Sequence, residues 1–150
     1  MTKVVEDKNN TKVFLFWDTE CPLCLNYTKD LGILSQEFKN DEIKFYWVFQ
    51  DDFDTSNEYF QDFGFKPNIL VDSFKALTKI LKATVTPEVF VLSKKNDLVY
   101  SGKIDNWMVS LGQKRQVVDS FYLKEALFAI KNEKIPSISR TEPIGCFIEQ

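Results

Sequence analysis

Residues 13–24 read VFLFWDTECPLC, and this stretch decides the fold of the chain. Its first five residues are an unbroken apolar run, as expected for a β-strand that is covered on both faces. From Pro22 onward, apolar residues recur every three or four positions, which is the pattern of one face of an α-helix: Cys24, Tyr27, Leu31, Leu34 and Phe38. A buried strand therefore leads directly into a long helix that carries two cysteines at its N-terminus.

The segments that follow alternate between strands and helices. In chain order we expect a strand at 43–49, a helix at 55–63 capped by Thr55 and ended by Gly64, a strand at 68–71, a helix capped by Ser73 with Phe74, Leu77 and Leu81 on one face, a strand pair at 88–92 and 98–102, a loop at 107–118 and a helix at 119–131. This order predicts an α/β fold, with a central mixed sheet flanked by helices.

The chain of 150 residues fits a single domain, 1–150, with a flexible N-terminus at 1–10 and an extended C-terminal tail at 132–150. The net charge is −3 and the Lys and Arg residues are scattered, which argues against nucleic acid as a partner. No apolar run approaches the ~18 residues of a transmembrane segment. Residues 1–12 are polar and contain no apolar signal-peptide core.

Histidine is absent from the sequence, and cysteine occurs three times. A Cys-His or Ser-His nucleophile pair is therefore excluded, and so is a metal site built on imidazole. Three thiolates are also one short of a closed four-coordinate zinc site. We expect neither a bound metal nor another cofactor.

The two cysteines of residues 21–24 have the spacing of a redox pair. Unpaired backbone N–H groups at a helix N-terminus stabilise an anion, and the thiolate is the nucleophilic form of cysteine. We expect Cys21 to face solvent and attack a partner disulfide, and the more buried Cys24 to resolve the mixed disulfide. Asp18 and Glu20 place negative charge beside Cys21, which opposes thiolate formation and favours a reducing protein. A Cys21 sealed in the core would contradict this role.

A second motif, Thr86-Pro87, immediately precedes the expected strand at 88–92. A proline in this position is compatible with a simple strand start or a sheet edge. Beside a CxxC pair, a cis peptide bond is the better explanation, because cis X-Pro bonds are uncommon and usually retained for a reason. Such a bond exposes the Thr86 backbone, so that it can pair with an extended substrate strand beside Cys21.

Together, Cys21-Pro22-Leu23-Cys24 and Thr86-Pro87 make residues 11–148 resemble the thioredoxin-like superfamily. An extra helix and strand at 55–71 resemble its redoxin branch, which contains peroxiredoxin-like and TlpA/ResA-type proteins. The segments 99–105 and 142–146 look like a bacterial redoxin-domain subgroup. The resemblance implies a thioredoxin-like fold and dithiol chemistry at Cys21 and Cys24. It also implies that Thr86, Pro87, Pro22 and Leu23 contact the substrate.

Some residues depart from the patterns of these relatives. Glu20 stands where thioredoxins proper have tryptophan. The peroxiredoxin signature is missing, because Thr19 lies two residues before Cys21 and no proline precedes it. Copper-delivery relatives use a longer cysteine spacing and a histidine, which this chain lacks.

The third cysteine, Cys146, lies in the context Pro-Ile-Gly-Cys-Phe near the C-terminus. We favour a role as a small apolar anchor for the tail. As an accessory thiol, it would instead resolve a disulfide with Cys21 or pair with another molecule.

The sequence favours a thiol–disulfide oxidoreductase that acts on protein disulfides or dithiols as a reductant. One alternative is a thiol peroxidase, in which Cys21 becomes a sulfenic acid that Cys24 or Cys146 resolves. A second alternative is a non-catalytic binding module. The subgroup resembled is often exported, which favours an extracytoplasmic (periplasmic) location over the cytoplasm.

Overall fold

The computed structural model describes residues 6–110 and 112–150, so part of the expected flexible N-terminus, residues 1–5, lies outside the described residues. The strands are β1 (Thr11–Phe16), β2 (Ile43–Phe49), β3 (Ile69–Val71), β4 (Val85–Thr86), β5 (Glu88–Leu92), β6 (Leu98–Gly102), β7 (Met108–Ser110), β8 (Gln113–Lys114) and β9 (Cys146–Phe147). The helices are α2 (Pro22–Glu37), α3 (Phe53–Tyr59), α4 (Ala76–Leu81) and α5 (Tyr122–Lys131).

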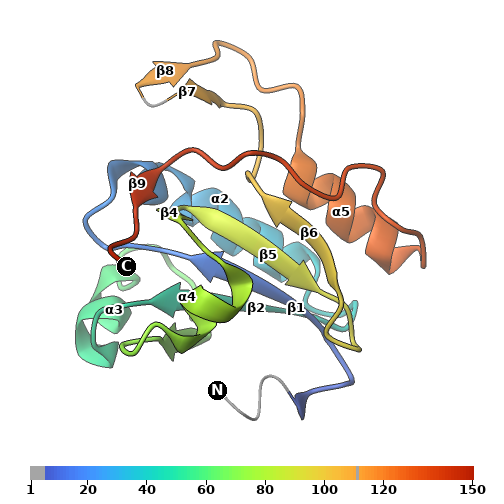
Figure 1. Cartoon of the computed structure of the whole chain (residues 1–150), viewed down its shortest axis with the longest axis horizontal. Coiled ribbons are helices and arrows are strands. Elements are labelled where there is room, and N and C mark those ends of the chain that lie inside the picture. Colours follow the sequence, from blue (N-terminus) through green and yellow to red (C-terminus); the bar gives the residue numbers. More distant parts are fainter. Residues whose placement is uncertain (1–5, 111) are drawn as a thin grey trace.

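A five-stranded sheet in the order β3-β2-β1-β5-β6 forms the centre of the molecule (Figure 1). Strands β1, β2 and β3 run parallel, whereas β5 is antiparallel to both β1 and β6. The sheet is therefore mixed, and the predicted α/β architecture is confirmed.

Two hydrophobic clusters cover the two faces of this sheet, because neighbouring side chains of a strand point to opposite faces. On one face, Val13 and Leu15 pack with α2 and α5. On the other, Phe14 and Phe16 pack with Leu77 of α4. Since both faces are covered, the apolar run of β1 is continuous.

Several local expectations are wrong. Helix α3 begins at Phe53 because the Asp52 carboxylate accepts a hydrogen bond from the Thr55 backbone N–H at 2.8 Å, so Asp52 is the cap instead of Thr55; the helix also ends before Gly64. Ser73 does not cap α4, because the Asp72 carboxylate accepts hydrogen bonds from two backbone N–H groups of this helix. Phe74, expected on the packed face, is 91% exposed.

The region before the last helix also differs from the expectation. Residues 107–118 contain the β7–β8 hairpin instead of a plain loop, and α5 begins three residues later than expected, at Tyr122.

The C-terminal segment after α5 crosses the molecule and brings β9 beside the start of α2 (Figure 1). It runs first along β6, where the Ser101 backbone donates to the Ser139 carbonyl at 3.1 Å and accepts from the Thr141 N–H at 3.0 Å. It then forms β9, which pairs with β4 in an antiparallel manner. Among the described residues, no helix is both long and apolar enough to cross a bilayer.

Candidate active site

Cys21 occupies the N-cap of α2, with extended backbone angles (φ −82°, ψ 118°), and Pro22 opens the helix. Pro22 has no N–H to leave unpaired, so this position suits it. The Cys21 carbonyl accepts from the Leu25 N–H at 3.1 Å, which is the first bond of the helix. The side chain of Cys21 therefore lies at the positive end of a 16-residue helix.

The structure joins Cys21 to Cys146 in a disulfide, across 125 residues of sequence and a Cα–Cα distance of 6.3 Å. Cys146 is therefore not a free thiol: it packs against the core cluster, as an anchor of the tail would, and it is bonded to Cys21. The expectation of a solvent-facing Cys21 is also wrong in this state, because its exposure is 2%. The C-terminal segment that carries Cys146 lies over it.

Thr86 lies next to both cysteines of the disulfide, Cys21 and Cys146. The bond from Thr86 to Pro87 is cis, and the Cys21 Sγ atom lies 3.4 Å from the Thr86 carbonyl oxygen. In the disulfide this sulfur has no proton, so the approach is a van der Waals contact; in the reduced thiol it becomes a hydrogen bond. β9 places Cys146 opposite Thr86, at the edge where the sequence analysis expects a substrate strand.

Cys24 is fully buried and is the one cysteine of the described chain outside the disulfide. Burial raises the pKa of its thiol to about 12, although hydrogen bonds from the Asp18 backbone and the Thr86 side chain oppose this rise. Thr86 therefore acts on both cysteines of the CxxC motif: its carbonyl oxygen lies against the Cys21 sulfur, and its side chain lowers the pKa of Cys24.

A buried polar network holds the helical turn that carries Cys24. The Thr28 hydroxyl donates its single proton to the Cys24 carbonyl at 2.7 Å. The Thr28 hydroxyl oxygen therefore accepts two hydrogen bonds, one from Trp17 Nε1 at 3.1 Å and one from the Tyr59 hydroxyl at 2.8 Å. Nothing in the local sequence around Thr28 signals this network, because Trp17 and Tyr59 lie in other segments of the chain.

Glu88 fixes the strand that precedes the cis bond. Its carboxylate, only 2% exposed as a residue, accepts from the backbone N–H groups of Thr84 at 2.8 Å and Val85 at 3.3 Å. Burial raises the pKa of this carboxyl, while the two N–H groups act in the opposite direction. The folded protein therefore holds the Glu88 proton more tightly than the unfolded chain.

We expect Glu88→Gln to stabilise the protein relative to wild type as pH increases from 4 to 7. Since the folded-state pKa is above its ordinary value of 4.5, the wild-type free energy of unfolding falls from about that pH upward, to the raised pKa. Glutamine keeps an acceptor for both N–H groups and does not titrate. Urea midpoints at pH 4 and pH 7 measure the difference. Glu58→Gln, on the exposed surface of α3, is the control, and an equal response of both variants would contradict the prediction.

The other predicted contact residues differ in their accessibility. Pro22 is exposed beside Cys21, whereas Leu23 is 7% exposed and packs into the core. The structure therefore gives Leu23 a packing role. No cluster of acidic or thiol side chains within residues 6–110 and 112–150 is arranged to hold a metal ion.

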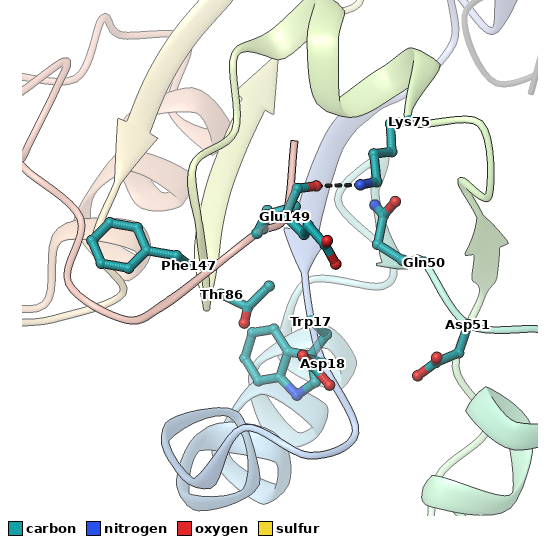
Figure 2. Close-up of a pocket in the computed structure, with 9 residues that line it drawn as sticks. Trp17, Asp18, Gln50, Asp51, Lys75, Thr86, Phe147 and Glu149 are labelled. Atoms are coloured by element: carbon teal, nitrogen blue, oxygen red, sulfur yellow. Dashed lines mark hydrogen bonds between the residues drawn. The ribbon is translucent and has the colours of Figure 1, made fainter.

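A polar cleft of about 310 Å³ lies between the residues that follow β1 and the C-terminal segment (Figure 2). Trp17 and Asp18 line it from the end of β1, and Phe147 and Glu149 line it from the C-terminal segment. Lys75 donates a hydrogen bond to the Glu149 carbonyl across it, which holds the end of the chain near α4. The cleft is thus partly built from the segment that carries Cys146.

A redoxin family profile matches residues 3–108 of the sequence. The chain belongs to the redoxin family. The β9 segment lies beyond the matched range. No curated protein sequence matches this redoxin.

Solved structures share its thioredoxin-like fold. A hypothetical protein from Sinorhizobium meliloti is similar with a TM-score of 0.78 and 19% identity, over 98% of this chain and 82% of that chain. A secreted disulfide oxidoreductase from Mycobacterium tuberculosis has a TM-score of 0.54 and 13% identity, over 62% of this chain and 69% of that chain. The bacterioferritin comigratory protein of Xanthomonas campestris, described by its alkyl peroxide reduction activity, has a TM-score of 0.58 and 17% identity, over 65% and 70%. The expected family branch and fold are confirmed.

Proposed function

We propose that this redoxin exchanges disulfides with protein partners and acts as a reductant, with Cys21 as the attacking cysteine and Cys24 as the resolving one. One observation carries this proposal. Cys21, at the start of α2, is bonded to Cys146. Cys146 lies on the extended strand β9 and pairs there with Thr86 of β4. This is the arrangement that a mixed disulfide with a partner strand would require.

The reaction has two balanced steps. The Cys21 thiolate attacks one sulfur of the partner disulfide, forms a mixed disulfide and expels the other partner sulfur as a thiolate. Cys24 then loses its proton to solvent and attacks Cys21, which releases the partner's second thiolate and leaves a Cys21–Cys24 disulfide. Each cycle oxidises two thiols of the redoxin and reduces one partner disulfide.

The surroundings of the site support a reducing protein. The N-terminus of α2 favours the Cys21 thiolate, but Asp18 lies close by and adds negative charge. Exposed Pro22 lies at the surface where a partner would approach. Cys21 is covered by the C-terminal segment, so reduction of its bond to Cys146 by an external dithiol, which becomes a disulfide, is the step that would free it for a partner.

Insulin reduction tests the proposal. We expect Cys21→Ser to abolish the reaction, because Cys24, the other cysteine at the start of α2, is fully buried and cannot reach a partner disulfide. Cys146→Ser is expected to retain activity, because this substitution leaves the Cys21–Cys24 pair intact. Equal activity of Cys21→Ser and wild type would rule out the proposal.

A thiol peroxidase is the second candidate, favoured by the Cys21–Cys146 disulfide itself. Peroxide would oxidise Cys21 to a sulfenic acid, and the Cys146 thiol would condense with it, forming the observed bond and releasing water. The similarity to the Xanthomonas campestris protein is in keeping with this chemistry. Peroxide consumption with a thiol donor separates the two functions. If Cys146 resolves the sulfenic acid of a peroxidase, Cys146→Ser loses peroxide consumption, whereas the proposed reductase keeps its insulin reduction in the same variant.

For its location, we propose an extracytoplasmic (periplasmic) compartment. The disulfide oxidoreductase of similar fold from Mycobacterium tuberculosis is described as secreted, which supports the proposal. Detection in the periplasmic or culture fraction of the native host tests it, with the cytoplasmic fraction as the alternative.

A further inference from the structure

The C-terminal segment occupies the β4 edge in the manner of a bound peptide. Cys146 lies opposite Thr86 and Phe147 opposite Val85, and the Ile148 N–H donates to the Thr84 carbonyl at 2.9 Å. A partner strand that presents a cysteine to Cys21 in this register needs the same backbone groups. The segment and a partner strand therefore exclude each other.

The position before the cysteine has no room for a side chain. A Cβ atom on Gly145 would lie 2.2 Å from the Thr86 carbonyl oxygen and 2.7 Å from the carbonyl carbon. Both atoms belong to the backbone of the residue held in the cis bond, so neither can rotate away as a side chain would. Gly145 does not have a positive φ, so the requirement comes from space and not from backbone conformation.

The neighbouring positions of the segment are less restricted. Ile144 packs against the cluster that contains α2, and Ile148 packs against the cluster that contains α4. Between them, the Phe147 side chain is 86% exposed. Apolar residues two positions before and two positions after the cysteine are thus accommodated, and the position directly after the cysteine is open.

We infer that residues 144–148 are a built-in copy of the partner strand, and that the partner is an extended segment with glycine directly before its reactive cysteine. This inference rests on the proposed function. The copy is released when an external dithiol reduces the Cys21–Cys146 bond and is itself oxidised to a disulfide, whereas the preceding residues stay held through the hydrogen bond between Thr141 and Ser101 on β6. Discrimination against any larger residue before the cysteine then follows from the fixed Thr86 carbonyl.

The test uses the full chain with the double substitution Gly145→Ala and Cys146→Ser, which prevents its own segment from docking. The probes are two synthetic peptides, TEPIGCFIEQ and TEPIACFIEQ, each joined through its cysteine to the coloured leaving group thionitrobenzoate. Cys21 attacks the peptide sulfur, forms the peptide mixed disulfide and expels one coloured thiolate. Glutathione joined to the same leaving group is the reference, because it makes no strand contacts.

We expect the glycine peptide to react about tenfold or more faster than the alanine peptide. Equal rates for the two peptides, with a reactive Cys21, would overturn the inference and leave the proposed function intact. A Cys21 that reacts with none of the three probes would instead contradict the proposed function. Near-ultraviolet circular dichroism checks that the double variant is folded. If the double variant does not fold, the single variant Cys146→Ser with excess peptide allows the rates of the glycine and alanine peptides to be compared.

Discussion

In the protein oxidised at Cys21 and Cys146, transfer of the disulfide to Cys21 and Cys24 is expected to accelerate about tenfold per pH unit between pH 7 and pH 9. Only the Cys24 thiolate can attack Cys21, and burial raises the pKa of Cys24 to about 12. Far below this pKa, the thiolate population increases in proportion to hydroxide concentration. We therefore expect the Cys21–Cys146 bond to transfer to Cys24 more slowly at neutral pH than at pH 9.

The location of the free thiol reports this transfer. The oxidised protein is incubated at each pH, quenched in acid and labelled with a maleimide, and peptide mapping shows whether Cys24 or Cys146 carries the label. Cys24→Ser is the control, because the transfer is then impossible. A rate that levels off near pH 8 would mean that Cys24 titrates as an exposed thiol, and complete absence of the Cys21–Cys24 isomer would contradict the resolving role of Cys24.

Gly102→Ala is expected to destabilise the protein by about 3 kcal/mol and to lower Tm by roughly 10 °C. Gly102 has φ +131°, a conformation that residues with a side chain rarely adopt. A Cβ atom there would also lie 2.2 Å from the Thr141 carbonyl oxygen. Thr141 cannot simply withdraw, because its hydroxyl accepts from the Lys103 N–H at 2.8 Å and pairs with the Tyr100 hydroxyl at 2.7 Å.

Gly112→Ala is the matched control for this substitution. Gly112 also has a positive φ, +85°, but a Cβ atom there would meet nothing within 4 Å. Its replacement is expected to destabilise the protein by only about 1 kcal/mol, from backbone strain alone. Thermal unfolding followed by circular dichroism measures both variants. Equal losses would show that the contact with Thr141 is unimportant and that the C-terminal segment is not fixed at β6.

Much of the candidate site follows from short stretches of sequence. The position of Cys21 at the start of α2 is predictable because an apolar run and a helical period meet there within a few residues. The Thr86-Pro87 motif is predictable as a pair of adjacent residues. The alternation of Ile144, Cys146 and Ile148 is a strand period that signals β9, but a two-residue strand in a polar tail is a weak pattern without its partner.

Local patterns also fail where a side chain from a neighbouring turn takes over. Thr55 and Ser73 both have the character of helix caps, yet Asp52 and Asp72 satisfy the backbone N–H groups instead. The carboxylates are stronger acceptors, and they precede Thr55 by three residues and Ser73 by one, so each helix starts where the carboxylate can reach it.

By itself, the sequence determined the mixed α/β architecture, the strand-to-helix junction with its two cysteines and the family of the chain. These features depend on hydrophobic periods and motifs, each of which is confined to a short stretch of sequence. The tertiary structure alone decided that Cys146 bonds Cys21, that Cys21 is covered and that Gly145 lies against Thr86. Strand pairing is set by backbone atoms that every residue possesses, so the sequence does not mark which of two distant segments will meet.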